Sequence, residues 1–258
     1  MKVVKIGGNV VDNPAMLESF CRDFALLEGP KVLVHGGGVM AGRIQEALGN
    51  PQVKIQGRRV TDAETLKVVT MVYAGLCNKT IVALLQKEGC NALGLSGCDA
   101  SVIKADKRAP LMIDGREVDF GFVGDVSSAS VDAARLRQFC DSGLVPVLSA
   151  INHDGAGNLL NTNADTVASS VAAALGAELI TCFEKKGVLL DVDDEDSVLP
   201  SLTPASYEAL KAEGRIADGM IPKLQNAFKA LHDGAARITI KHAADLLDAG
   251  SGTSITLG

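Results

Sequence analysis

Residues 1–14 read "MKVVKIGGNVVDNP", an apolar run that carries one internal lysine and ends in two glycines. The run from Val3 to Ile6 is typical of a buried strand. Lys5 is costly inside such a strand unless its ammonium group emerges at the strand end and faces an anion. The "DNP" that follows offers Asp12 or Asn13 as a helix N-cap, with Pro14 at the first helical position. The stretch therefore predicts a strand, a glycine turn and a helix.

The same alternation continues along the chain. "KVLVH" predicts a second buried strand, "GGG" a tight turn, and residues 39–48 a second helix, so we expect a parallel sheet with right-handed crossovers. Thr61 and Glu64 form a possible capping box for a long helix that reaches about Lys87. Short runs broken by glycine predict antiparallel hairpins over residues 102–126. Further elements are a helix over residues 166–175, a buried strand at "NALGLSG", and strands at "LVPVLSA", "ELITCF", "RITIK" and "TSITLG".

Composition limits the class of protein. The chain has 258 residues, 47% of them apolar and 22% charged, with a formal charge of -6, which is typical of a globular protein and argues against a nucleic-acid partner. We find no signal segment and no stretch apolar enough to span a bilayer, so we expect no membrane partner and a cytoplasmic location. Six scattered cysteines without a CxxC pair predict reduced thiols, with no disulfide framework and no zinc site.

Four segments fall where a predicted strand ends or a predicted helix begins: "KIGG", "HGGG", "NTNAD" and "DGMIPK". In open parallel sheets, ligands bind outside the carboxyl ends of the strands. Glycines there leave backbone N–H groups open to a phosphate or carboxylate at a helix start. Each glycine cluster taken alone is equally well explained as a tight turn. Neither cluster is a GxxxxGK[ST] loop or a GxGxxG motif.

Three charged residues at these positions form a possible catalytic group. Lys5 and Lys223 each lie near a strand end or helix start, and Asp165 in "NTNAD" could hold both ammonium groups in place. The alternatives are a solvated surface lysine at position 223 and a plain N-cap at position 165. Arg59 in "GRRVT" could form a two-pronged bond to a substrate carboxylate, while Arg58 could face water. Asn161 and Asn163 are otherwise turn-forming residues.

Five motifs in this order, "KIGG", "VHGGG", "GRRVT", "NTNADT" and "DGMIPKL", resemble the amino acid kinase family over essentially the whole chain. The resemblance is closest to the branch that phosphorylates N-acetyl-L-glutamate, in the second step of arginine biosynthesis. It implies a three-layer α/β/α sandwich around an open, mostly parallel sheet of about eight strands. It also implies an N-terminal lobe over residues 1–175 for the acylated glutamate and the dimer contacts, and a C-terminal lobe over residues 176–258 for ATP.

The resemblance also implies a role for each matching residue. Lys5 and Lys223 are expected to stabilise the transition state, with Asp165 orienting both. Gly8 and Gly37 are expected to offer N–H groups to the transferring phosphoryl group. The acylated glutamate is expected to contact Gly37, Gly38, Arg59 and Asn161. The nucleotide is expected to lie against Glu184, Lys185, Lys186, Gly187, Val188, Leu189, Arg215, Ile216 and Ala217.

ATP is the expected co-substrate, and Mg²⁺ is expected to arrive on its phosphates, which is consistent with the absence of a dense carboxylate cluster in the sequence. The segment "CFEKKGVLLDVDDEDS" departs from the usual family pattern, because Glu184 stands where an aspartate is common. The chain begins only four residues before Lys5, and so resembles the dimeric members that lack an extra N-terminal helix.

Several alternatives stay open at this stage. An N-acyl group longer than acetyl, such as succinyl, is compatible with "GRRVT". Kinases of the same family that act on aspartate, free glutamate, uridylate or isopentenyl phosphate are disfavoured by the first motif, the length or Arg59. A protein of another class, a sensor that binds an amino acid or nucleotide without catalysis, would not need Lys5, Asp165 and Lys223 together.

Overall fold

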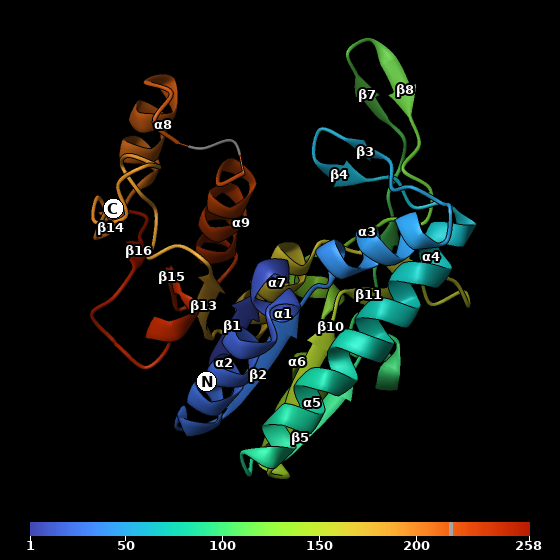
Figure 1. Cartoon of the computed structure of the whole chain (residues 1–258), viewed down its shortest axis with the longest axis horizontal. Coiled ribbons are helices and arrows are strands. Elements are labelled where there is room, and N and C mark those ends of the chain that lie inside the picture. Colours follow the sequence, from blue (N-terminus) through green and yellow to red (C-terminus); the bar gives the residue numbers. More distant parts are fainter. Residues whose placement is uncertain (217–218) are drawn as a thin grey trace.

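Eight strands form one central sheet (Figure 1). The structure is a computed structural model, and it describes residues 1–216 and 219–258. Neighbouring strands are parallel, except that β15 and β16 are antiparallel. From one edge to the other, the strands are β14 (Ser201–Leu202), β16 (Thr253–Ile255), β15 (Arg237–His242), β13 (Glu178–Phe183), β1 (Lys2–Ile6), β2 (Lys31–His35), β10 (Val145–Ser149) and β5 (Ala92–Leu95).

Strand β1 lies in the middle of this sheet, which explains the apolar run at the start of the chain. Val3 and Val4 are fully buried because β1 has a strand on each side and helices over both faces. Lys5 pairs in register with Thr181 of β13 and with Val34 of β2. The carboxyl ends of these three strands therefore meet at one edge, and the predicted parallel sheet is confirmed.

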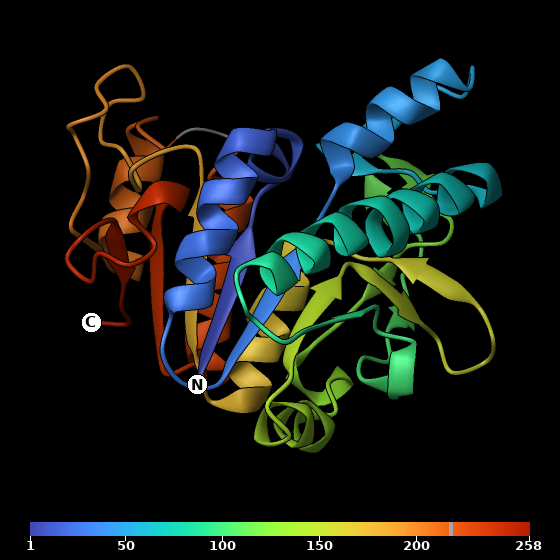
Figure 2. The ribbon, with the colours of Figure 1, turned by 60° about the horizontal axis from the view of Figure 1, so that its bottom comes forward.

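Helices cover both faces of the sheet, which confirms the predicted three-layer sandwich (Figure 2). Helix α7 packs on β1 and β13, and α5 packs on β5 and β10. The layer that contains α7 consists of α6 (Ala133–Asp141), α7 (Ala164–Leu175) and α9 (Ile221–His232), with α8 (Pro204–Ala212) against α9. The layer that contains α5 consists of α2 (Pro14–Leu26), α4 (Ala63–Thr70) and α5 (Asn78–Lys87). Two further helices, α1 (Gly8–Asp12) and α3 (Gly38–Ala47), follow the two glycine turns.

The helix starts agree only partly with the predictions. Asn13 caps α2 as expected. The predicted capping box at Thr61 is wrong, because the N-cap of α4 is Asp62, whose carboxylate accepts the N–H of Thr65 at 2.7 Å. The Thr61 hydroxyl instead accepts the side-chain amide of Asn161 at 3.0 Å, which uses it for a tertiary contact. Helix α1 was not predicted. Helix α7 begins at residue 164, two residues before the predicted start at 166.

The predicted long helix over residues 62–87 contains a π-helical segment, η1 (Met71–Cys77), between α4 and α5. By length and composition alone, the run over residues 63–87 could cross a membrane, which corrects our statement that no such stretch exists. Buried helices of globular proteins meet the same criterion. In this fold, Ile81 and Leu85 are fully buried, and α5 packs on the sheet.

Hairpins at the carboxyl edge of the sheet account for the irregular part of the chain. The hairpins predicted over residues 102–126 are confirmed as two antiparallel pairs. The antiparallel pairs are β3 (Lys54–Ile55) with β4 (Arg58–Arg59), β6 (Asp106–Lys107) with β9 (Gly124–Asp125), β7 (Leu111–Ile113) with β8 (Arg116–Val118), and β11 (Ile151–His153) with β12 (Leu159–Asn161). Short 3-10 turns are η2 (Asp99–Ser101), η3 (Ser128–Ser130) and η4 (Ala243–Asp245).

All six cysteines carry free thiols, as the spacing predicted. Burial raises the pKa of Cys21 and of Cys182 to about 12, so these two thiols stay protonated and unreactive. Cys77 and Cys90 are also buried, Cys140 is half-buried and Cys98 is exposed.

Candidate active site

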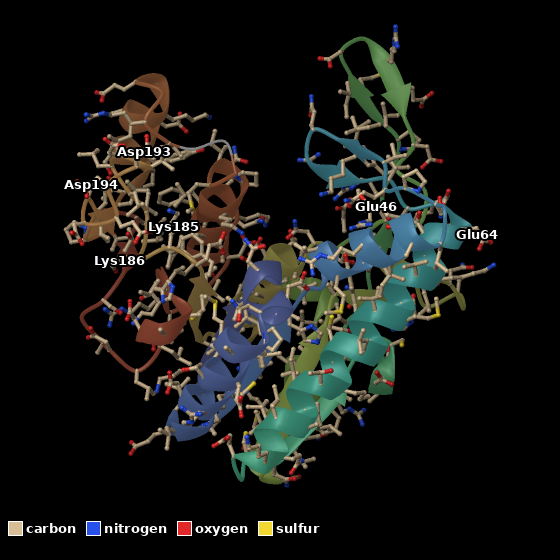
Figure 3. All side chains as sticks on the ribbon, viewed as in Figure 1. Glu46, Glu64, Lys185, Lys186, Asp193 and Asp194 are labelled. Atoms are coloured by element: carbon tan, nitrogen blue, oxygen red, sulfur yellow. The ribbon has the colours of Figure 1, made fainter. Side chains whose placement is uncertain are left out.

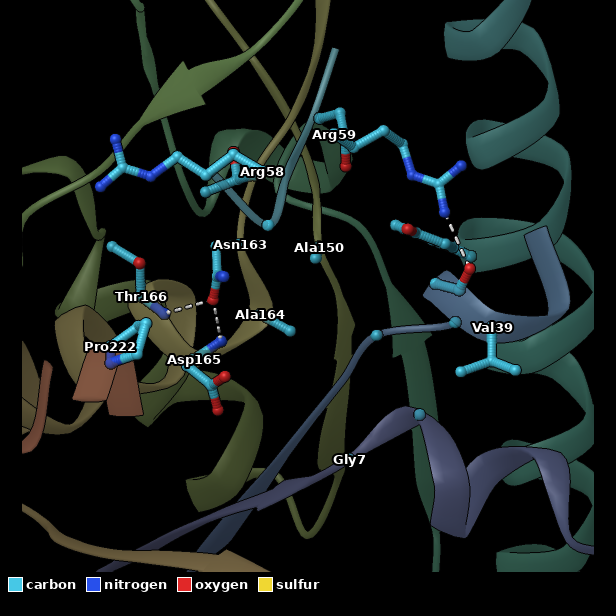
Figure 4. A pocket seen from close by; sticks show the side chains of 18 of the residues that line it. Gly7, Val39, Arg58, Arg59, Ala150, Asn163, Ala164, Asp165, Thr166 and Pro222 are labelled. Carbon is cyan, nitrogen blue, oxygen red and sulfur yellow. Dashed lines mark hydrogen bonds between the residues drawn. The ribbon is translucent and has the colours of Figure 1, made fainter. Parts of the chain in front are cut away.

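A cavity of about 760 Å³ opens at the carboxyl ends of β1 and β2 (Figure 4). Its walls include both glycine turns, the "NTNAD" segment at the start of α7, and strand β4. Pro222 and Lys223, from the first turn of α9, complete one side. The four segments that the sequence placed at strand ends therefore line one space, at the edge where parallel sheets bind ligands.

Three charged side chains meet in this cavity. The Lys5 ammonium lies 2.7 Å from Oδ1 of Asp165, and the Lys223 ammonium lies 3.2 Å from Oδ2 of the same carboxylate. The side chains of Lys5, Asp165 and Lys223 are 5%, 19% and 25% exposed, respectively. Each carboxylate oxygen thus holds a different ammonium group, although positions 5 and 223 are 218 positions apart in the sequence.

The protonation states follow from this arrangement. Burial alone would raise the pKa of Asp165, but the two ammonium groups outweigh it and lower this pKa to about 2. Burial lowers the pKa of Lys5, while the Asp165 carboxylate acts in the opposite direction. Two ammonium groups thus face one carboxylate, and this excess of positive charge suits an anionic ligand.

The start of α7 explains why Asp165 points into the cavity. Asn163 is the N-cap, and its side-chain oxygen accepts the N–H of Asp165 at 2.7 Å and that of Thr166 at 3.3 Å (Figure 4). Asp165 therefore lies inside the first turn, where the helix dipole favours a carboxylate. The alternative interpretation of Asp165 as the N-cap is wrong, because Asn163 already holds that position.

The two glycine turns stand at helix starts beside these charges. Gly8 is the first residue of α1, and Gly37 is the N-cap of α3. A Cβ atom at Gly37 would lie 2.8 Å from Cδ1 of Tyr73 and 2.9 Å from Sγ of Cys77, both on η1. Glycine is required at position 37 because the π-helical segment packs directly on the turn.

Arg59 is held against the second glycine turn. Its Nη2 donates to the carbonyl oxygen of Gly38 at 2.8 Å (Figure 4). Its Nη1 donates to Oε1 of Gln45. Gln45 is buried and in turn donates to the Thr65 hydroxyl at 3.0 Å. The guanidinium therefore has a fixed position at the cavity wall, which suits two-pronged recognition of a carboxylate.

Asn161 and Arg58 complete this side of the cavity. Asn161 is 8% exposed, and its amide donates to the Thr61 hydroxyl at 3.0 Å. Arg58 is exposed, as the sequence suggested, and it also lines the cavity. The predicted substrate residues Gly37, Gly38, Arg59 and Asn161 are therefore brought together, although their contacts with a substrate stay a prediction.

Among the residues that the structure describes, the predicted nucleotide segment reaches the cavity only at its first residue. Glu184 lines the cavity, and its carboxylate accepts the side-chain amide of Asn9 at 2.8 Å. Lys185 pairs with Glu195 and Lys186 pairs with Asp196, in the exposed acidic loop over residues 191–196. Figure 3 labels the two lysines together with Asp193 and Asp194 of this loop.

The other predicted nucleotide residues are less open to a ligand. Val188 is buried, and its N–H donates to the Thr253 hydroxyl at 2.9 Å. Gly187 packs on Thr253, Leu189 pairs with Val198, and Ile216 is buried. Arg215 is exposed. Ala217 lies outside the described residues, so the nucleotide contacts stay a prediction.

Sequence reasoning missed several residues at the site. Asn9 reaches across to Glu184, and Gln45 holds Arg59. His35 lies beneath the second glycine turn, where it contacts Asn78 of α5. The "VHGGG" motif contained this histidine, and a histidine at the end of a fully buried strand was the available signal.

Replacement of Asp165 tests the electrostatics of the site. In Asp165→Asn, two ammonium groups lose their shared carboxylate, so we expect the free energy of unfolding at pH 7 to fall by about 3 kcal/mol. The folded-state pKa of Asp165 is below its ordinary value of 3.8, at about 2, so its stabilisation is complete above the ordinary value. The gap between wild type and variant should narrow as pH falls through this interval, in urea unfolding at a series of pH values. A constant gap would contradict the arrangement.

Comparison with known proteins identifies the same family that the five sequence motifs suggested. Residues 1–242 match the model of the amino acid kinase family. An acetylglutamate kinase of Bacteroides thetaiotaomicron is 51% identical over 252 residues, which cover 96% of this chain and 95% of that protein. An acetylglutamate kinase of Methanopyrus kandleri is 40% identical, with 99% of this chain and all of that protein covered.

Solved structures show the same fold. The structure of smu.665 from Streptococcus mutans superimposes with a TM-score of 0.79, at 28% identity, over 100% of this chain and 98% of that one. An N-acetylglutamate synthase from Neisseria gonorrhoeae, complexed with coenzyme A and N-acetylglutamate, gives a TM-score of 0.82 at 24% identity. This chain spans 59% of that longer protein, so the likeness shows the fold alone. The match of residues 1–242, the eight-stranded sheet and the relatives together show that the chain belongs to the amino acid kinase family.

Proposed function

We propose that the protein is an acetylglutamate kinase, which uses ATP to convert N-acetyl-L-glutamate to N-acetyl-L-glutamyl 5-phosphate in arginine biosynthesis. The observation that carries this proposal is the meeting of Lys5 and Lys223 on Asp165 inside the cavity. Relatives named acetylglutamate kinase at about half identity, over nearly the full length of both chains, support the substrate.

The chemistry of this reaction fits the residues present. A glutamate side chain has an ordinary pKa near 4.3, so it is already an anion at neutral pH and needs no general base. The barrier arises because two anions must approach in line while charge spreads over the oxygens of the transferring phosphoryl group. Lys5 and Lys223 supply positive charge at that point, and Asp165 keeps both ammonium groups in place.

The remaining roles follow from position in the cavity. The N–H groups of Gly8 and Gly37 hold the transferring phosphoryl group, because both glycines stand at helix starts beside the lysines. Arg59 binds the α-carboxylate of the acylated glutamate, with Gly38 and Asn161 beside it. The nucleotide lies toward Glu184 and the first turn of α9.

Magnesium arrives with ATP in this proposal. No group of three or more histidine, cysteine, aspartate or glutamate side chains is placed to hold a metal ion in residues 1–216 and 219–258. The residues present suit an Mg²⁺ ion that takes most of its ligands from the phosphate oxygens of ATP. Glu184, which lines the cavity, is the carboxylate expected nearest to the nucleotide. Bound there, Mg²⁺ neutralises phosphate charge.

The lobes, the assembly and the location complete the proposal. Residues 1–175 form the lobe for the acylated glutamate, and residues 176–258 form the lobe for ATP. Two copies associate through the long helix, where Met71 and Leu76 of η1 are 59% and 51% exposed and present apolar surface. The protein acts in the cytoplasm on small molecules, with no nucleic acid and no membrane as partner.

A kinase of glutamate with a longer N-acyl group is the second candidate function, because the cavity contains more positive side chains than N-acetylglutamate requires. N-acetylglutamate carries two carboxylates, which Arg59 and the lysine cluster match. Lys54, Arg58 and Arg108 also line the cavity, and of these Arg108 pairs with Asp125. The two remaining cations would suit an acyl group that ends in a third carboxylate, such as succinyl.

An acyl-phosphate assay tests the proposal. The protein is incubated with ATP, Mg²⁺ and hydroxylamine, together with N-acetylglutamate, N-succinylglutamate or free glutamate. We expect hydroxamate and ADP to form with N-acetylglutamate and not with free glutamate. A much higher kcat/KM with N-succinylglutamate would select the second candidate. Binding of acylated glutamate without any turnover would reject both in favour of a sensor.

Removal of either lysine tests the charge at the phosphoryl group. Lys5→Ala and Lys223→Ala should each lower kcat at least about a hundredfold, because a preorganised charge is lost from the transition state. Circular dichroism should show an unchanged fold. Lys67→Ala, on the exposed face of α4, is the control and should keep normal turnover. Near-normal turnover in both site variants would defeat the assignment.

Arg59→Ala tests the placement of the acylated glutamate. We expect KM for that substrate to rise about tenfold to a hundredfold, as a charge-assisted hydrogen-bond pair is lost, while KM for ATP stays unchanged. Arg22→Ala, at an exposed position on α2, controls for the loss of an arginine. A rise in KM for ATP alone would place Arg59 in the wrong subsite.

A further inference from the structure

A buried imidazole beneath the second glycine turn has no role in the reaction as described so far. His35 is the last residue of β2 and is 0% exposed. Its Nδ1 lies 2.8 Å from the carbonyl oxygen of Gly36. Its Nε2 lies 3.0 Å from Nδ2 of Asn78, the first residue of α5. Both ring nitrogens therefore have a partner.

These partners fix the position of the proton on the ring. A carbonyl oxygen only accepts, so Nδ1 of His35 must carry the hydrogen that Gly36 accepts. With its hydrogen on Nδ1, the ring can only accept at Nε2, so the Asn78 NH₂ group donates to it at 3.0 Å. The same NH₂ group donates to the carbonyl oxygen of Val147 at 2.9 Å and lies 3.5 Å from that of Leu95. The imidazole is therefore neutral, with its hydrogen on Nδ1.

The Asn78 amide cannot turn to offer its oxygen instead. Asn78 is fully buried, and its Oδ1 accepts the Lys79 ammonium at 3.1 Å. A Cβ atom at Gly94 of β5 would lie 2.2 Å from this Oδ1, so the side chain occupies space that only glycine leaves open. The amide orientation and the imidazole tautomer are thus set together by the packing of α5 on β5.

We propose that His35 is a positioning residue that aims the Gly37 N–H at the transferring phosphoryl group, and that Asn78 keeps the imidazole in the required tautomer. The Gly36 carbonyl and the Gly37 N–H belong to one planar trans peptide, so they point in opposite directions. The hydrogen bond from His35 turns the carbonyl toward the buried ring and the N–H away from it. This inference rests on the proposed function, which assigns the Gly37 N–H to the phosphoryl group.

The glycine turn needs such a constraint from outside. Three successive glycines, residues 36–38, have wide conformational freedom, which costs entropy to fix. The Gly37 N–H has no acceptor among residues 1–216 and 219–258, so no hydrogen bond of its own holds its direction. A donor contributes to catalysis only when its direction is set before the charge develops. His35 sets that direction from the buried side of the turn.

Kinetics of His35 variants test the inference. His35→Leu removes the donor to Gly36 and should lower kcat about a hundredfold, the typical value of one preorganised N–H donor, with KM for N-acetylglutamate and for ATP within about threefold. His35→Asn places its amide nitrogen where Nδ1 stands, so it should recover at least about tenfold in kcat over His35→Leu.

Lys31→Met is the matched control, at the other end of the same strand. Lys31 is buried and donates to the carbonyl oxygens of Phe24, Ala25 and Leu27 at 2.8, 2.9 and 2.6 Å. Its loss should lower the melting temperature as much as His35→Leu does, without lowering kcat. Equal losses of kcat in Lys31→Met and His35→Leu, or no recovery in His35→Asn, would overturn the inference, because kcat would then follow stability alone.

A measurement independent of activity separates the inference from the proposed function. Long-range ¹H–¹⁵N correlation spectra of the wild-type imidazoles at pH 6 should show His35 neutral with its proton on Nδ1. Burial lowers the pKa of His35 to about 4, the Gly36 hydrogen bond opposes this shift, and Lys79 adds to it. An Nε2–H tautomer or an imidazolium would overturn the inference and leave the kinase assignment intact. Absence of turnover in wild type with every acylated glutamate would instead overturn the proposed function.

Discussion

One buried carboxylate bound to two ammonium groups is the interaction on which the site depends. Asp165 contacts Lys5 of β1 and Lys223 of α9, and so connects the middle of the sheet with a helix near the end of the chain. Each buried charge is costly when left alone, so the three side chains are stable only as a group. Their combined charge stays positive, which leaves the cluster able to bind a phosphate.

The fold supplies the geometry for this cluster. Lys5 can occupy a buried strand because β1 ends at the carboxyl edge of the sheet, where its ammonium group reaches Asp165. The two glycine turns begin helices at the same edge because parallel strands all end there. Behind the second turn, the π-helical segment η1 brings Tyr73 and Cys77 against Gly37. Side chains from three layers therefore converge on one small volume.

Much of this could be predicted from sequence, because the deciding patterns are local. The apolar run around Lys5 predicted a buried strand, and the order of five motifs predicted the family and a set of residues that line the cavity. The π-helical segment and the Asp62 cap were missed because tertiary contacts decide them, such as the use of the Thr61 hydroxyl by Asn161. The Nε2 partner of His35 is Asn78, 43 positions further along the chain, and Asn78 in turn donates to Val147, so no local pattern contains this network. The nucleotide contacts stay a prediction, because Lys185 and Lys186 form ion pairs and Val188 is buried within the fold.

The central claim is that both lysines act on one phosphoryl group. A crystal structure with MgADP, N-acetylglutamate and aluminium fluoride, which imitates the transferring group, tests it most directly. The account predicts the ammonium groups of Lys5 and Lys223 within hydrogen-bond distance of the fluoride atoms, with Asp165 still between them. A complex in which either ammonium group points away from the fluoride would contradict it.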